Sequence, residues 1–253
     1  MNAAARAGLH RGLNFQGELV LDTNALNSSR GFSLVELLMV IGILGILMAI
    51  MASAVSVMLE DSRRSASSIN AHIITAGYLI YTTDHGRGFV PRSQLGNTSH
   101  PAYSADSIED VALGLAKFQG LDSAALWFVD TDPQLIGKHL PDRVTDGDPA
   151  NATACAPDFQ NTSPKAWAFV SGLPGSAPGS TPLLWTYGLD TTSGQWNPHS
   201  PWRGAGGHIA FLDGHVAWYA IAPTNLFTGA VLQQNHFASS GTSAPIILNP
   251  MGK

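Results

Sequence analysis

Charged side chains are scarce in this chain. Asp, Glu, Lys and Arg make up 12% of its 253 residues, against roughly 25% in ordinary soluble domains. The 13 basic residues do not outnumber the 18 acidic ones, so the chain lacks the positive excess with which proteins release counterions from a phosphate backbone. We therefore expect no nucleic acid partner.

Cysteine is almost absent as well. Cys155 is the single one in the chain, so a disulfide within the chain is excluded. No other Cys and no His neighbours it in the sequence at a spacing typical of a nucleophile or a metal site. We expect a small buried side chain, with a reactive thiol or an intermolecular disulfide as the alternatives.

The missing charge is concentrated in one apolar tract. Residues 37–59 contain 23 side chains without a formal charge. That length suffices to cross a hydrocarbon core of about 30 Å as a helix, which takes roughly 20 apolar residues. A buried core helix is the alternative, but such helices seldom run so far without a polar face. The tract therefore predicts one transmembrane helix, and no other stretch of the sequence approaches it in length.

A carboxylate stands at the entrance of this tract. Within residues 28–36 a polar stretch ends in Arg30, and an acidic side chain follows six residues later at Glu36. An ionised Glu within lipid costs a few kcal/mol on insertion scales. Glu36 therefore needs a partner or a function, unless it is solvated at the level of the head groups.

Residues 30–36 read RGFSLVE and continue into LLMVI. This segment resembles the prepilin-type cleavage and methylation signal of type IV pilins and type II secretion pseudopilins. The resemblance implies that prepilin peptidase cuts between Gly31 and Phe32, removes residues 1–31 as a leader, and methylates the new amine of Phe32. In that family the carboxylate that corresponds to Glu36 meets the amine of a neighbouring subunit and sets the register of assembly.

The same resemblance implies a structural subunit of a secretion pseudopilus or a pilus-like filament, and not an enzyme. Its partners would be copies of itself, other pilin-like subunits, the inner-membrane assembly machinery and membrane lipid, with no cofactor. The protein would cross the bacterial inner membrane once, with a cytoplasmic N-terminus and a periplasmic head, before it enters an extracytoplasmic filament. The sequence does not choose between secretion, adhesion, motility and DNA uptake, or between a major and a minor subunit.

The residue types suit these roles. Gly31 has no side chain, so the scissile bond can be presented in an extended form. Glu36 follows Phe32 by four residues, which places both on one face of a helix. A buried ion pair between them contributes specificity more than stability. Basic residues lie on both sides of the tract, at Arg30 before it and Arg63 after it, so a positive-inside count does not fix the orientation.

A rival signal lies within the tract. Residues 52–54 read ASA, a pattern after which conventional signal peptidase could cut and release a soluble protein. The long apolar stretch and the acidic residue at its entrance disfavour that site. The matching functional alternative is a membrane-tethered or secreted enzyme or sugar-binding domain that uses the tract only for export, although the sequence contains no G-x-S-x-G, H-E-x-x-H, Walker A or dinucleotide motif.

The expected fold class is α+β. Beyond the tract, Ile69, Ile73, Ala76 and Ile80 recur at helical spacing, which predicts that one helix continues over residues 32–85 with these side chains on its buried face. The resemblance implies that this second half packs on a small antiparallel sheet in a pilin-like head at 86–253. Removal of the leader would change the formal charge from −5 to −6.

Within the head, residues 89–164 are rich in Pro, Ser and Asp and are interpreted as a variable insertion with one or two short helices. Strands are predicted at 167–170 and 183–187. Residues 207–219 predict a hairpin, in which Asp213-Gly214 would form a type I′ turn. This hairpin partly resembles a C-terminal pilin-associated signature in which nine residues separate a His from Asp-Gly.

The signature is incomplete, because Arg203 occupies the position of the His, and His199 and His208 are out of register. Asp213 and His215 could instead contribute to a catalytic or metal site, but no third ligand stands at a diagnostic distance. The acids at 142–148 invite a calcium site, yet their spacing lacks the ligand pattern of a recognised loop. A solvated turn is the favoured interpretation there.

Overall fold

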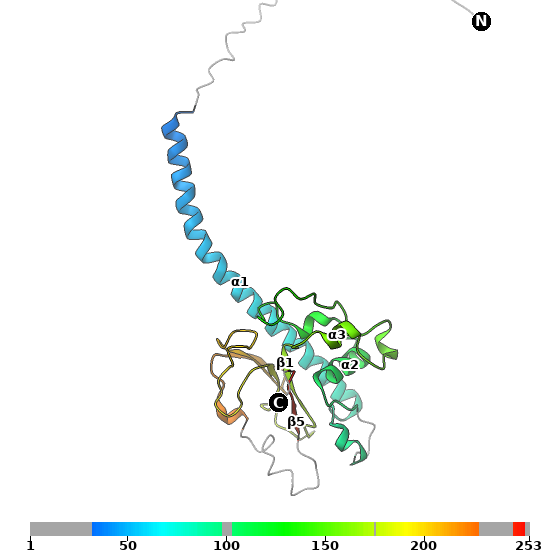
Figure 1. Ribbon diagram of the computed structural model, residues 1–253. Helices are drawn as coiled ribbons and strands as arrows, with labels where there is room; N and C mark the ends of the chain where they lie inside the picture. Colours follow the sequence, from blue (N-terminus) through cyan, green and yellow to red (C-terminus); the bar gives the residue numbers. More distant parts are fainter. Residues whose placement is uncertain (1–31, 98–102, 175, 228–244, 251–253) are drawn as a thin grey trace, which may run out of the picture. The chain divides into compact units, whose positions relative to one another are not determined.

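The computed structural model describes residues 32–97, 103–174, 176–227 and 245–250. The chain divides into two compact units, residues 1–53 and residues 54–253, which are treated separately below. The fold is α+β, as predicted, with a long apolar helix at the N-terminus and a five-stranded antiparallel sheet (Figure 1).

Helix α1 spans Leu34–His85. In the first unit its 18-residue segment Leu34–Met51 has a mean hydropathy of 2.7 and is not buried at all. At 1.5 Å per residue the segment is about 27 Å long. Among the described residues it is the one helix that is long and apolar enough to span a membrane. The helix begins two residues later than expected, since Phe32 and Ser33 lie outside it.

In the second unit, the buried face of α1 is opposite to the one that the isoleucine spacing predicted. Ile69 and Ile80 are 57% and 53% exposed, so the prediction was wrong for these two, whereas Ile73 is partly buried against the core. The buried side chains recur at the same spacing on the other side of the helix, at Ser67, Ala71, Ile74, Tyr78 and Tyr81. The large aromatic rings of Tyr78 and Tyr81 decide the face, because each buries more area than an isoleucine and packs against other rings of the core.

The sheet has the order β4-β3-β2-β1-β5, and every neighbouring pair is antiparallel. Its strands are β1 Trp167–Ser171, β2 Pro182–Thr186, β3 Gly207–Phe211, β4 Val216–Tyr219 and β5 Ile246–Leu248. The three central strands are buried along their whole length. Tyr78 of α1 meets Phe169 of β1 edge-on, with 5.2 Å between ring centroids, so the helix and the sheet share one core.

The turn between β3 and β4 is not the type I′ turn that Asp-Gly predicted. Gly214 has a φ of 88°, whereas Asp213 does not have a positive φ. The amide of Gly214 donates to the Phe211 carbonyl at 2.9 Å, and the amide of Phe211 donates to the His215 carbonyl at 3.0 Å. This is a three-residue loop that ends in a left-handed glycine. Asp213 stabilises it by accepting the amide proton of His215.

Short helices fill the stretch between α1 and β1, more of them than the sequence indicated. They are η2 Arg92–Asn97, α2 Ile108–Gln119, η3 Ala124–Trp127, η4 Pro149–Asn151 and α3 Pro157–Asn161, and a further turn, η5 Thr224–Leu226, follows β4. Helix α2 is closed at both ends, because Ser107 and Asp110 form a reciprocal capping box and Gly120 ends it in the left-handed conformation. These caps satisfy backbone groups that a short helix would otherwise leave unpaired.

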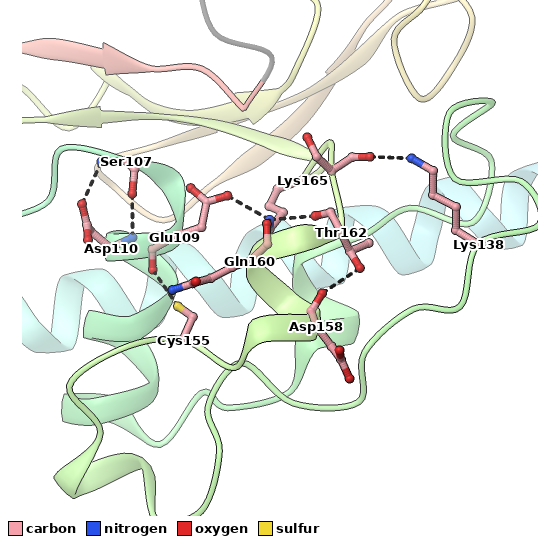
Figure 2. Close-up of polar contacts among 10 residues, drawn as sticks. Ser107, Glu109, Asp110, Lys138, Cys155, Asp158, Gln160, Thr162 and Lys165 are labelled. Atoms are coloured by element: carbon pink, nitrogen blue, oxygen red, sulfur yellow. Dashed lines mark hydrogen bonds and ion pairs between the residues drawn. The ribbon is translucent and has the colours of Figure 1, made fainter.

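A buried lysine ties α2 to the segment before β1 (Figure 2). Lys165 is only 1% exposed, and its ammonium group donates to Glu109 Oε1 at 2.8 Å and to the Thr162 carbonyl at 2.7 Å. It also lies 4.8 Å from the centre of the Phe159 ring. Burial of a lysine is tolerated when a carboxylate and carbonyl oxygens replace its hydration, so this contact fixes the insertion on the core.

A buried histidine joins the stem of α1 to the sheet. His208 of β3 places Nδ1 3.3 Å from the hydroxyl of Ser67, and its ring centroid lies 4.9 Å from that of Trp218. Burial lowers the pKa of His208 to about 4, and the positive charge of Arg64 contributes in the same direction. The folded head therefore holds this imidazole neutral.

This pKa predicts acid sensitivity. Because the folded pKa lies below the ordinary value near 6.5, the contribution of His208 is complete above pH 6.5 and is lost as the pH falls towards 4. We expect the free energy of unfolding to drop by about 2 kcal/mol between pH 6.5 and 5 from this group. Chemical denaturation of the full chain and of His208→Gln at both pH values measures it. If the free energy of unfolding fell by the same amount in the full chain and in His208→Gln, His208 would not be the source of the acid sensitivity.

Candidate processing and assembly site

The first turn of α1 is closed by two reciprocal hydrogen bonds. The amide of Ser33 donates to Glu36 Oε2 at 3.0 Å, and the amide of Val35 donates to Ser33 Oγ at 3.3 Å. The amide of Leu37 donates to the Ser33 carbonyl at 3.1 Å, which begins the helical ladder. Ser33 is thus the N-cap and Glu36 the third helical residue. The arrangement resembles a capping box, except that the Ser33 hydroxyl accepts the amide of the second helical residue, Val35, in place of the third.

This cap determines where the helix begins relative to the predicted cleavage point. Phe32 precedes the cap, is 77% exposed and has no helical backbone. Gly31 lies outside the described residues. Proteases bind substrate in an extended form, in which backbone groups are free to pair with the enzyme, so a helix that begins at Leu34 leaves Phe32 available on the carboxyl side of a scissile bond. The carboxylate of Glu36 lies at the positive end of the helix dipole, where negative charge is stabilised.

The rival cleavage site is presented differently. Residues 52–54 are helical and lie in the middle of α1. Cleavage after Ala54 would require a helical turn to unwind first. Phe32, on the carboxyl side of the prepilin-type bond, is not helical.

The other candidate residues do not gather into a site. Asp213 pairs with His215 across the β3–β4 turn, and the pKa of Asp213 is lowered chiefly by the His215 amide that it accepts. Arg143 lies within the acidic segment 142–148 and binds Asp122 and the Gly147 carbonyl, while Asp148 caps η4. Within the described residues no three His, Cys, Asp or Glu side chains come together in a group that could hold a metal ion.

Cys155 is buried, as expected. Its thiol donates to the Glu109 carbonyl at 3.3 Å, and burial raises the pKa of Cys155 to about 12. A thiol in this state is a poor nucleophile, because the thiolate is the reactive form. The protein therefore presents no activated cysteine at neutral pH.

The tryptophans bear on the sugar-binding alternative. A carbohydrate surface needs exposed indole faces, but five of the six tryptophans are buried: Trp127, Trp167, Trp185, Trp196 and Trp202. Trp218 is partly buried and packs against the core. The five buried rings pack in the interior of the head, so they present no indole face to a sugar.

The comparisons with known proteins agree with the N-terminal geometry. Residues 26–52 match a family model described as the prokaryotic N-terminal methylation motif. The match includes Gly31, Phe32, the capping residues and the apolar first half of α1, and it leaves the head uncovered. No curated protein and no solved structure is significantly similar to the chain.

The chain thus carries a prepilin-type N-terminal methylation motif, which supports a type IV pilin-like or pseudopilin protein. A signal of this kind implies processing by prepilin peptidase and assembly with other pilin-type subunits, and it suggests a structural role in place of a catalytic one. The signal and the unburied apolar helix are consistent with membrane anchoring.

Sequence reasoning missed Ser33. Ser33 lies within the segment that resembles the cleavage signal, but Ser-x-x-Glu before an apolar run is also a recognisable helix start. That spacing would also have placed the first helical residue at Leu34 in place of Phe32.

The cap predicts a local effect of Ser33. In Ser33→Ala the Val35 amide loses its acceptor, which destabilises the first turn by about 1 kcal/mol, equivalent to roughly fivefold faster exchange of that amide. Hydrogen exchange on the full chain in detergent micelles measures this, and Ser33→Asp, which retains an acceptor, serves as the control. Unchanged exchange at Val35 in Ser33→Ala would show that the hydroxyl does not cap the helix.

Proposed function

We propose that this chain is a structural subunit of a type II secretion pseudopilus or a type IV pilus-like filament, which assembles through α1. The observation that carries the proposal is the coincidence of the methylation motif with a helix whose apolar side chains are unburied and whose first turn holds a single carboxylate. Such a surface needs lipid or other helices to cover it. A filament core supplies the helices.

Processing would occur between Gly31 and Phe32, with methylation of the Phe32 amine. The division into a leader at 1–31, a stem at 32–85 with its membrane part at about 37–59, and a head at 86–253 follows from that cut. Prepilin peptidase and the inner-membrane assembly machinery are the proposed partners. The proposed location is the inner membrane, with the N-terminus in the cytoplasm and the head in the periplasm, followed by the extracytoplasmic filament.

Glu36 would change partners during this sequence. In the uncleaved chain its carboxylate accepts the amide of Ser33, so the charge is partly satisfied before processing. Cleavage creates an α-amine at Phe32, which is cationic at neutral pH and stays cationic after methylation. The carboxylate can then pair with the amine of a neighbouring subunit, which fixes the axial register of the two helices.

The stem offers a second contact surface. Ile69 and Ile80 are exposed on the side of α1 that faces away from the sheet, three helical turns apart. Exposed isoleucines in a regular row on a helix can pack against the stem of another copy. This row supports assembly along the whole helix and not through its membrane segment alone.

The competing function is a tethered or secreted enzyme or sugar-binding domain. N-terminal sequencing of the mature protein separates the two, because Phe32 supports the filament subunit and Val55 the secreted domain. In cells without prepilin peptidase the 253-residue precursor should accumulate in the membrane. Unaffected maturation in those cells would remove the main support for the filament subunit.

Two substitutions at Glu36 distinguish the role of its charge from the role of its hydrogen bond to the Ser33 amide. Gln can still accept the Ser33 amide at this position, so Glu36→Gln keeps the cap and loses the charge, while Glu36→Ala loses both. We expect both variants to be inserted and cleaved, and filament yield to fall at least tenfold in both. Electron microscopy and immunoblots of sheared filaments measure the yield, with Ser33→Ala as the charge-retaining control. Normal filaments from Glu36→Gln would refute the ion pair.

Substitutions at the outer row of the stem test the second surface. Ile69→Gln combined with Ile80→Gln preserves helix propensity and removes exposed apolar area, so we expect an unchanged unfolding temperature, normal processing and several-fold fewer filaments. Ile221→Gln, at an isoleucine that is equally exposed on the head, controls for a general loss of surface hydrophobicity. If the double variant assembles as well as this control, the row takes no part in assembly.

A further inference from the structure

A cavity of about 470 Å³ lies in the second unit, between the start of its helical stem and the loops of the head. Glu60 and Arg63 of α1 line one side, and Asp130, Thr131, Trp202 and Arg203 line the other. Its volume falls within the usual range of small-molecule sites, about 300–1,000 Å³. The cavity is distinct from the N-terminal processing site.

The cavity is lined by both acidic and basic side chains, and not all of them form ion pairs. Glu60 pairs with Arg64 along the helix. The ion pairs of the described residues include none to Arg63, Arg203 or Asp130. Three charges without an ion-pair partner thus line the cavity, two guanidinium groups and one carboxylate. They favour an occupant that carries a negative group for the guanidinium groups and a positive group for the carboxylate.

Two neutral donors add to this pattern. The Thr131 hydroxyl and the Trp202 indole N–H are buried and make no hydrogen bond to the described residues. A buried donor without an acceptor costs free energy, and an oxyanion at this cavity is an acceptor that a small side-chain adjustment could bring within reach. Both donors belong to residues that line the same cavity as Arg63 and Arg203.

The loop that carries Arg203 is held in a sparsely populated conformation. Arg203 has a φ of 53°, a left-handed backbone that costs a non-glycine residue of order 1 kcal/mol. Its amide donates to the Ser200 carbonyl at 2.9 Å, and the Gly204 amide donates to Ser200 Oγ at 3.1 Å. These bonds fix the backbone on both sides of the arginine, so its side chain starts from a defined position on the cavity wall.

The cavity lies where the exposed apolar surface of the helix ends. Within the second unit, α1 begins with exposed Val55, Val57, Met58 and Leu59, and Glu60 and Arg63 follow within about one turn. Ile136, which is 68% exposed, also lines the cavity. If the apolar residues lie in lipid, the cavity is at the level of the phospholipid head groups, where tryptophan is also favoured.

We propose that this cavity binds the head group of a zwitterionic phospholipid, with the phosphate between Arg63 and Arg203 and the ammonium at Asp130. The proposal rests on membrane anchoring through α1. Guanidinium groups suit phosphate because their planar N–H forks match two of its oxygens. An anionic head group without an amine would leave Asp130 unpaired beside a negative charge, so the site prefers phosphatidylethanolamine to phosphatidylglycerol. Bound lipid holds the head against the membrane until the subunit enters the filament.

Native mass spectrometry of the full chain in detergent, offered equal amounts of phosphatidylethanolamine and phosphatidylglycerol, tests this site. We expect one retained lipid and at least a fivefold preference for phosphatidylethanolamine. Arg63→Gln and Arg203→Asn should each reduce retention of both lipids at least fivefold, and Asn tolerates the left-handed backbone at position 203. Asp130→Asn should abolish the preference while it retains phosphatidylglycerol. Arg92→Gln, at an exposed arginine on η2, should change nothing.

Several outcomes would overturn the proposal. Equal lipid retention by the cavity variants and Arg92→Gln would show that the lipid binds elsewhere. Displacement of the lipid by millimolar inorganic phosphate would show a free-phosphate site, and displacement by a second copy of the chain would show a protein interface. The measurement uses the unprocessed chain, so its result is independent of cleavage and filament assembly; normal processing of the cavity variants in cells would confirm that the two proposals are separate.

Discussion

The structure depends on an apolar helical surface that nothing in the described part of the chain covers. The segment Leu34–Met51 is unburied along its length, so its burial must come from lipid or from other helices. A surface of this kind is compatible with two environments in succession, because alkyl side chains pack about as well against acyl chains as against one another. Discrimination between lipid and other helices then depends on polar groups, and Glu36 is the one charged residue within Leu34–Met51.

That carboxylate is placed by local structure before any partner arrives. The capping bonds to Ser33 hold it at the first turn, where the helix dipole favours negative charge. The interaction proposed for assembly therefore begins from a carboxylate whose position is already fixed and requires it to exchange the Ser33 amide for a new partner. An exchange of that kind is sensitive to geometry, which is what a register-setting contact needs.

The sequence predicted the fold class and the motif well, because both depend on long or dense local signals. An uncharged run of 23 residues and an Asp-Gly between apolar runs are readable without knowledge of distant contacts. The errors came where tertiary packing decides. Ile69 and Ile80 have the spacing of a core face, yet Tyr78 and Tyr81 occupy the core, since aromatic rings from α1, β1 and the loop at Phe89 fill it.

Other features had no local signal at all. Strand β5 pairs with β1 although its residues lie 75 to 79 positions further along the chain, and the ion pair of Lys165 with Glu109 joins residues 56 positions apart. The type of the β3–β4 turn was missed because the loop is anchored from outside, by bonds from Leu212 and Asp213 to the carbonyls of Thr181 and Gly179. By contrast, Ser33 had a local signal that was simply not used.

The two opposite faces of the stem constrain how the chain can change in length. One face of α1 carries the sheet through Tyr78, and the other presents Ile69 and Ile80. A single residue inserted between positions 69 and 78 would rotate Tyr78 and Ile80 by about 100° relative to Ile69, which would break the exposed row and displace the ring that packs on the sheet. The number of residues in this part of α1 is therefore constrained. Insertions in the loops of the head are tolerated, because they leave the orientation of the helix faces unchanged.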